Sequence, residues 1–283
     1  MTNHINPDPN QQNNTSWKET EGKLPFSMTN DYLFCAMLQK NNLVLKSLIC
    51  SLLHLEASNV QSIEITNPIE LGDSLTEKTF ILDIKVIMNS NTLMNLEMQV
   101  LNYHDWPERS LSYLCRSFSS QLQHGDDYSQ VKPAIHISIL DFTLFSNYPE
   151  FFANYYMMNE KNHQLYSDKL RVSVLCLTQI NQATEEDKNY HIDTWARLFK
   201  CSDWRELQML ANNDSSIQEA VNTIHQISED EKLRYQCIRR EEALRRERTL
   251  HNQLEKSKQQ HLEDIKEISR LKKLLAEHGI SDQ

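Results

Sequence analysis

Two acidic residues in neighbouring apolar segments have the types and spacing needed to bind a metal ion, and a glutamine lies beside the second of them. Asp83 lies in the first segment, and Glu97 and Gln99 lie in the second with one residue between them. Because successive residues of a strand point to opposite faces, Glu97 and Gln99 share one face, and the apolar residues around them share the other. Carboxylate oxygens are preferred ligands of Mg²⁺. The pattern therefore predicts paired strands with one apolar face and one face that carries acidic metal ligands.

The turn at residues 89–92 determines how these two strands pair. A hairpin register that keeps the apolar face continuous pairs Val86 with Met94 and places Asp83 directly opposite Glu97. Directly opposed residues have β-carbons about 4.5–5.5 Å apart, so the two carboxylates repel each other unless a cation lies between them. The residues alone leave two interpretations open: a metal site, and a solvent-facing strand surface whose charges happen to align.

Asp83, Glu97 and Gln99, taken in order, resemble the D…E-x-(K/Q) signature of the PD-(D/E)XK nucleases. More narrowly, the sequence resembles the recombination-promoting nuclease and transposase-like (Rpn-type) family, in which Gln often stands in place of Lys. The resemblance covers residues 25–205. The further segments that resemble this family are 30–34, 108–113 with 125–128, and 132–142.

This resemblance implies a restriction-endonuclease-like α+β fold and a DNA endonuclease that depends on Mg²⁺ (or Mn²⁺), acts on double-stranded DNA and is associated with mobile elements or recombination. Asp83 and Glu97 would bind the metal, which would lower the pKa of a bound water and neutralise charge on the phosphate. Gln99 would complete the catalytic set, because it can donate a hydrogen bond and orient the attacking water, although it carries no charge. The alternative is an inactive descendant that acts in DNA binding or self-association.

Four other residues in these segments each have two interpretations, and a fifth has one. Asp31 could reach the site from the start of the first helix, but an acidic residue there also stabilises the helix dipole. Arg109 and Tyr113 share a helix face and could contact phosphate or only pack. Lys85 shares the strand face of the first carboxylate and could supply a positive charge there, but the sequence favours an ordinary surface lysine. His136 lies on an alternating strand, and we expect it to be structural.

Hydrophobic periodicity predicts an α+β architecture, a mixed central sheet flanked by helices. The helix at 30–56 should break at Asn41-Asn42, where the apolar spacing is interrupted. The predicted strands are 60–65, 80–88, 93–100, 134–142 and 170–178, and the other predicted helices are 107–123, 193–200, 203–211 and 217–227.

The two ends of the chain differ from this body in composition. Residues 1–22 are rich in Asn, Gln, Pro and Thr and predict a disordered arm, which leaves 23–227 as the nuclease-like domain with a helical extension. Residues 228–283 are densely charged, and Gly and Pro are absent up to Glu277, which predicts one long helix and a possible coiled coil. Its sparse Leu/Ile spacing favours a homodimer. A cluster of arginines at 239–248 either contacts the DNA backbone or forms an ordinary solvated face.

Composition excludes several other classes of protein. Only 4 glycines leave no room for a Gly-rich nucleotide-binding loop, so we expect no small-molecule cofactor. No apolar run is long enough to cross a membrane, and the polar N-terminus does not resemble a signal peptide. The 6 cysteines include no C-x-x-C pair, which predicts reduced thiols in the cytoplasm. A net charge of −10 argues against strong nonspecific binding to nucleic acid.

Overall fold

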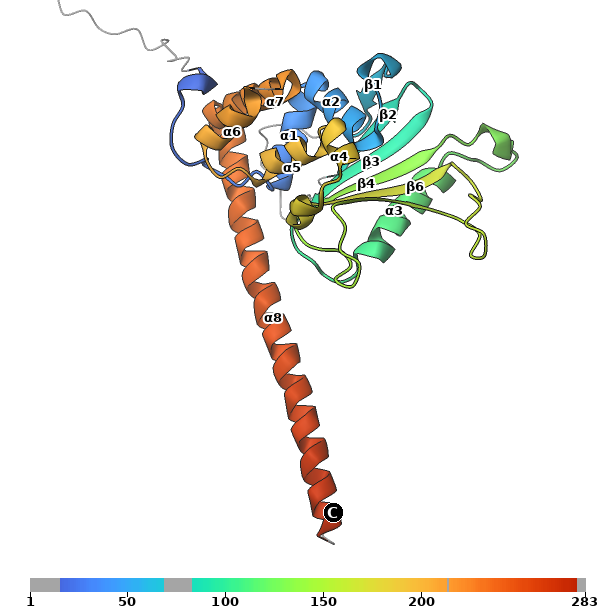
Figure 1. Ribbon diagram of the computed structural model, residues 1–283, viewed down its shortest axis with the longest axis vertical. Coiled ribbons are helices and arrows are strands. Elements are labelled where there is room, and N and C mark those ends of the chain that lie inside the picture. The colour runs from blue at the N-terminus through green and yellow to red at the C-terminus, as the bar shows by residue number, and fades with distance from the viewer. Residues whose placement is uncertain (1–15, 69–82, 213, 279–283) are drawn as a thin grey trace, which may run out of the picture. The chain divides into compact units, whose positions relative to one another are not determined.

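A six-stranded mixed sheet carries the candidate residues (Figure 1). The computed structural model describes residues 16–68, 83–212 and 214–278, and the strand order in the sheet is β1-β2-β3-β4-β6-β5. β3, β4 and β6 run parallel, whereas the β1–β2, β2–β3 and β5–β6 pairs are antiparallel. The strands span Ile63–Ile65 (β1), Asp83–Met88 (β2), Thr92–Gln99 (β3), Ala134–Leu140 (β4), Phe152–Tyr156 (β5) and Leu170–Cys176 (β6).

The β2–β3 hairpin has the predicted register. Val86 pairs with Met94, and Asp83 pairs with Glu97. Met88 pairs with Thr92, so three residues form the turn. Two of them, Asn89 and Ser90, have φ values of 51° and 52° in the left-handed region, which the tight turns of hairpins commonly use. The part of the predicted strand that precedes Asp83 lies outside the described residues.

Helices cover the apolar face of the sheet and enclose the main core. Asn30 caps the first of these helices, accepting a hydrogen bond from the Leu33 amide at 3.1 Å. Asn41 breaks the helical segment as predicted, because its side chain caps the helix that follows. The helices that contribute to this core are α1 (Asp31–Lys40), α2 (Asn42–Leu53), α5 (Ile192–Lys200), α6 (Trp204–Ala211), α7 (Ser215–Glu229) and, through Leu233 and Cys237, the first turns of the C-terminal helix.

In the described part of the chain, one helix, α3 (Trp106–Ser119), packs on the opposite face of the sheet, against β4 and β6 (Figure 1). Pro107 lies in its first turn, where a missing amide hydrogen costs nothing. The helix ends at Ser119, four residues before the predicted end. Its second, smaller core contains Trp106, Leu114 and the apolar residues of β4 and β6 that face it. The polar face of the β2–β3 hairpin therefore belongs to the side of the sheet that α3 covers.

The sequence did not predict β5 or the short helix α4 (Glu185–Asn189). β5 lies at one edge of the sheet, and among the described strands it pairs with β6 alone. α4 begins with a capping box in which Thr184 and Asp187 exchange hydrogen bonds. Both elements are short and lack a clear apolar period, so their formation depends on the tertiary neighbours that they find.

The N-terminal arm predicted over residues 1–22 is ordered from Ser16 onward in the described part of the chain. A short 3₁₀ turn, Trp17–Glu19, packs its aromatic ring against the main core. The Gln208 side chain donates hydrogen bonds to the carbonyls of Trp17 and Thr20 at 2.9 and 2.8 Å. Because Trp17 is a lone apolar residue among polar ones, hydrophobic periodicity gave no sign of this contact. Residues 1–15 lie outside the described residues.

The C-terminal helix, α8, spans Glu231–Glu277. It begins three residues after the predicted start, because α7 continues to Glu229 and Asp230 interrupts the helical path. The Asp230 carboxylate accepts a hydrogen bond from the Leu233 amide at 3.0 Å and so caps the new helix.

The chain divides into two compact units, residues 1–238 and 239–283. None of the described helices combines the length and apolar character that crossing a membrane demands.

Candidate active site

Asp83 and Glu97 lie directly opposite each other on β2 and β3, as the sequence predicts. Their side chains are buried, with only 4% and 5% of each residue exposed to solvent. The interpretation as a solvent-facing strand surface is therefore wrong for these two positions. Two buried like charges at adjacent strand positions are unfavourable without a compensating cation.

The two oxygens of the Glu97 carboxylate have different environments. Oε1 accepts a hydrogen bond from Nη2 of Arg109 at 2.6 Å, whereas Oε2 is buried and has no hydrogen-bond partner among the described residues. Burial raises the pKa of Glu97 to about 7, although Arg109 acts in the opposite direction, and the charges of Asp83 and Asp31 raise it further. Burial also raises the pKa of Asp83, against the effects of Lys85 and Arg109. The site therefore has more negative charge than the neighbouring cations balance.

This pair of carboxylates fits a hard divalent cation. The unpartnered Oε2 of Glu97 is a free ligand atom, and a cation would relieve the electrostatic cost of ionising both acids. Within the described ranges, no group of three or more His, Cys, Asp or Glu side chains is placed to hold a metal ion. Mg²⁺ does not require one, because it commonly binds through one or two carboxylates and keeps several waters.

Gln99 shares the strand face of Glu97, but its side chain is already engaged. Its Nε2 donates a hydrogen bond to the carbonyl of Leu101 at 3.0 Å, so one of its two N–H groups is directed to the backbone that follows β3. The residue is half-buried. The structure therefore places Gln99 beside the carboxylate pair with reduced freedom to orient a water.

Arg109 and Tyr113 come to the site from α3. The guanidinium of Arg109 lies over the rings of Trp106 and Tyr113, 5.4 and 5.7 Å from their centroids. Sequence spacing placed Arg109 and Tyr113 on one helix face, but it gave no sign of the ion pair with Glu97. That contact depends on the angle at which α3 crosses the sheet.

Asp31 and Lys85 lie at the margin of the site. Asp31 is buried in the first turn of α1, where its carboxylate accepts a hydrogen bond from the Tyr32 amide at 2.9 Å. Its charge reaches Glu97 and raises the pKa of that residue. Lys85 is exposed, and its charge lowers the pKa of Asp83. Both residues thus influence the carboxylate pair electrostatically.

His136 on β4 is buried, in agreement with the structural role expected from the sequence. The Asn95 amide donates to its Nδ1 at 3.2 Å, and its ring stacks on Tyr113. Burial, and then Arg109, lower the pKa of His136 to about 4, so the ring is neutral at pH 7. Sequence analysis missed the partnership with Asn95, although Asn95 lies on the same predicted strand face as Glu97.

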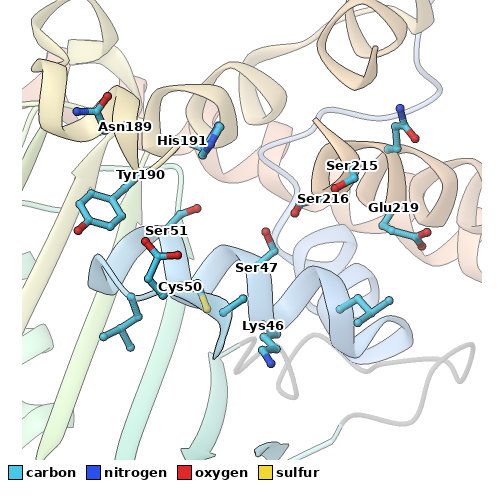
Figure 2. A pocket seen from close by; sticks show the side chains of 15 residues that line it. Lys46, Ser47, Cys50, Ser51, Asn189, Tyr190, His191, Ser215, Ser216 and Glu219 are labelled. Carbon is cyan, nitrogen blue, oxygen red and sulfur yellow. The ribbon is translucent and has the colours of Figure 1, made fainter. Parts of the chain in front are cut away.

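A separate pocket of about 760 Å³ lies in the helical layer on the other side of the sheet (Figure 2). α2, the link between α4 and α5, and the start of α7 line it. Some of the polar groups in and around it already have protein partners. Lys46 donates to the Val60 carbonyl at 2.7 Å, and the carboxylate of Asp214 caps α7 and lies 3.2 Å from His191. This pocket contributes nothing to the carboxylate site.

Comparison with known families agrees with this geometry. The family model described as "PD-(D/E)XK nuclease family transposase" matches residues 28–266, which is most of the chain. No curated protein and no solved structure matches it significantly. The matched region contains the whole sheet, the buried carboxylate pair and the helix that contacts it. This chain therefore belongs to the PD-(D/E)XK nuclease family of transposases.

Proposed function

We propose that this protein is a metal-dependent DNA endonuclease that uses Mg²⁺ or Mn²⁺ to hydrolyse phosphodiester bonds in double-stranded DNA. The family match makes a nuclease with a mobile-element or recombination role the natural expectation. The observation that carries the proposal is the buried pair of opposed carboxylates, Asp83 and Glu97, with one carboxylate oxygen left without a partner. A purely structural strand pair gains nothing from such an arrangement.

Asp83 and Glu97 would together hold the cation. When bound, the metal would supply a more acidic water and neutralise charge on the phosphate oxygens. Asp31 adds negative charge that favours the cation, and Gln99 has one N–H left with which to orient water. In hydrolysis the water oxygen forms a bond to phosphorus, the bond to one bridging deoxyribose oxygen breaks, and that oxygen gains a proton. No oxidant or reductant is required.

Cleavage of supercoiled plasmid, with Mg²⁺ or with EDTA, tests this proposal. Asp83→Asn and Glu97→Gln keep the side-chain shapes but remove the charges that bind the cation, so both variants should remain folded and lose Mg²⁺-dependent cleavage. Glu64→Gln is the matched control, because Glu64 is an exposed carboxylate on the neighbouring strand β1. Full activity in either site variant would show that the metal assignment is wrong.

Two observations favour a second candidate, a nuclease-fold protein that binds DNA without cutting it. Gln99 is neutral and partly engaged with the backbone, and Arg109 occupies one oxygen of Glu97. If the wild-type protein bound duplex DNA in a gel-shift assay but left plasmid intact with Mg²⁺ and with Mn²⁺, this candidate would replace the first.

We infer that the second unit, residues 239–283, mediates homodimerisation in the cytoplasm through its own apolar stripe. The described part of this unit is a helix with exposed apolar residues at Leu250, Leu254, Leu262, Ile265, Ile268, Leu271 and Leu275. A helix that leaves one apolar stripe in water is only marginally stable alone. A second copy of the same helix is the simplest partner, since most soluble oligomers are homo-oligomers.

The exposed Arg245 and Arg246 are candidates for contact with DNA phosphates.

A further inference from the structure

We propose that Arg109 is a catalytic residue of this centre, which pairs with Glu97 in the free protein and contacts the non-bridging oxygens of the scissile phosphate when DNA is bound. This inference rests on the proposed nuclease function. In this proposal the positive charge of the site comes from Arg109 on α3, and not from position 99 on β3, where a neutral glutamine stands.

The contacts of Arg109 distinguish it from the other polar groups near the carboxylates. Its guanidinium lies 2.6 Å from Oε1 of Glu97, whereas Lys85 forms no ion pair with either acid in the described part of the chain. Gln99 is neutral and donates to the Leu101 carbonyl. The Arg109 side chain is 37% exposed, so a phosphate from solvent can reach a cation that already touches the buried site.

The guanidinium is held in position by its surroundings. It lies over the rings of Trp106 and Tyr113, and both rings are anchored in turn. The Trp106 indole donates to the hydroxyl of Ser138 at 3.1 Å, and Tyr113 stacks on His136, with ring centroids 5.9 Å apart. A donor that is fixed before substrate arrives stabilises developing charge without reorganisation.

The geometry of arginine suits a contact with two partners at once. A guanidinium has five N–H donors in a planar fork, and the bond to Glu97 uses only part of this capacity. The remaining donors match the spacing of two phosphate oxygens. During hydrolysis, negative charge increases on the non-bridging oxygens while water adds to phosphorus and the leaving oxygen departs, so a cation at this position stabilises the transition state more than the bound substrate.

Single-turnover cleavage of plasmid DNA by Arg109→Gln, with Arg116→Gln as the matched control, tests the assignment. Arg116 lies two turns further along α3, is exposed and forms no ion pair within the described residues, so its loss removes the same charge without touching the carboxylates. We expect Arg109→Gln to lower the cleavage rate by about 10²–10³-fold, the usual effect of losing one donor to transition-state charge, and Arg116→Gln to lower it by less than about threefold. Arg109→Lys keeps the charge but not the fork, and it should retain an intermediate rate.

A second measurement separates this role from a structural one. Mn²⁺ binding to the protein without DNA, measured by calorimetry, should be unchanged or tighter in Arg109→Gln, because Glu97 loses a competing cation. Methylguanidinium should partly restore cleavage by Arg109→Ala, and methylammonium at the same concentration should not. Weaker Mn²⁺ binding together with a lower unfolding temperature would indicate a structural role and overturn the assignment.

The outcomes distinguish this inference from the proposed function. If the wild-type protein cleaves DNA and Arg109→Gln cleaves within about threefold of it, Arg109 is not catalytic, yet the nuclease function stands. If the wild-type protein does not cleave DNA with either metal, the proposed function fails, and the catalytic assignment of Arg109 fails with it.

Discussion

Replacing Glu97 by glutamine should stabilise the metal-free protein at high pH and hardly at all at low pH. Burial raises the pKa of Glu97 from 4.5 to about 7, so the folded chain binds this proton more tightly than the unfolded chain. For an acid whose pKa is raised on folding, stability is greatest below the unfolded pKa and is lost as pH rises through the folded one. One unit of pKa difference corresponds to about 1.4 kcal/mol, so the ionised Glu97 costs about 3 kcal/mol.

The free energy of unfolding, measured with urea in EDTA from pH 5 to pH 8, tests this directly. Between these limits the wild-type protein should lose about 2–3 kcal/mol of stability relative to Glu97→Gln, because only the wild type titrates at this position. Asp83 remains in both proteins, so the part of its titration that does not depend on Glu97 cancels in the difference. Glu64→Gln, an exposed control, should follow the wild type. If wild type and Glu97→Gln gave parallel pH profiles, burial would not be perturbing Glu97, and the electrostatic basis of the site would be wrong.

Two further predictions concern the scaffold. Replacing Ile268 and Leu275 together by Glu should halve the mass measured by light scattering, because it interrupts the apolar stripe of the second unit. Lys266→Glu controls for the added negative charge. An unchanged mass in the double variant would exclude association through this helix. Asn30→Ala should lower the free energy of unfolding by about 2 kcal/mol or more, because it removes a helix cap and a buried 2.8 Å bond to the Cys237 carbonyl. A loss below about 0.5 kcal/mol in urea unfolding would contradict that estimate.

The sequence predicted the hairpin well because two independent constraints agree there. The strands alternate between apolar and polar residues, so a slip of one residue would expose the whole apolar face. The short turn at Asn89 and Ser90 then permits only the register that pairs Asp83 with Glu97. The positions of the two carboxylates therefore follow from local sequence, as do β4 and β6.

Other features of the site could not be read from local patterns. The contact between Arg109 and Glu97 joins a helix to a strand, and its existence depends on how α3 crosses the sheet. The partnership of Asn95 with His136 depends on which strand lies beside β3, and periodicity does not specify strand order. β5 was missed for the same reason, because an edge strand is defined by the neighbour that it pairs with.

The presence of Gln rather than Lys at position 99 is consistent with this electrostatic arrangement. Arg109 already pairs with Glu97 from α3, and a lysine at position 99 would place a second cation on the same strand face as that carboxylate. Two cations competing for Glu97 would weaken its affinity for the proposed divalent metal, which would bind through the unpartnered Oε2. A neutral residue at 99 leaves that oxygen available, and a charge on α3 remains half-exposed and able to meet a phosphate. In this proposal the strands supply the carboxylates that bind the metal, and α3 supplies the cation that binds the phosphate. This separation follows because one arginine cannot fully balance the charge of two buried acids.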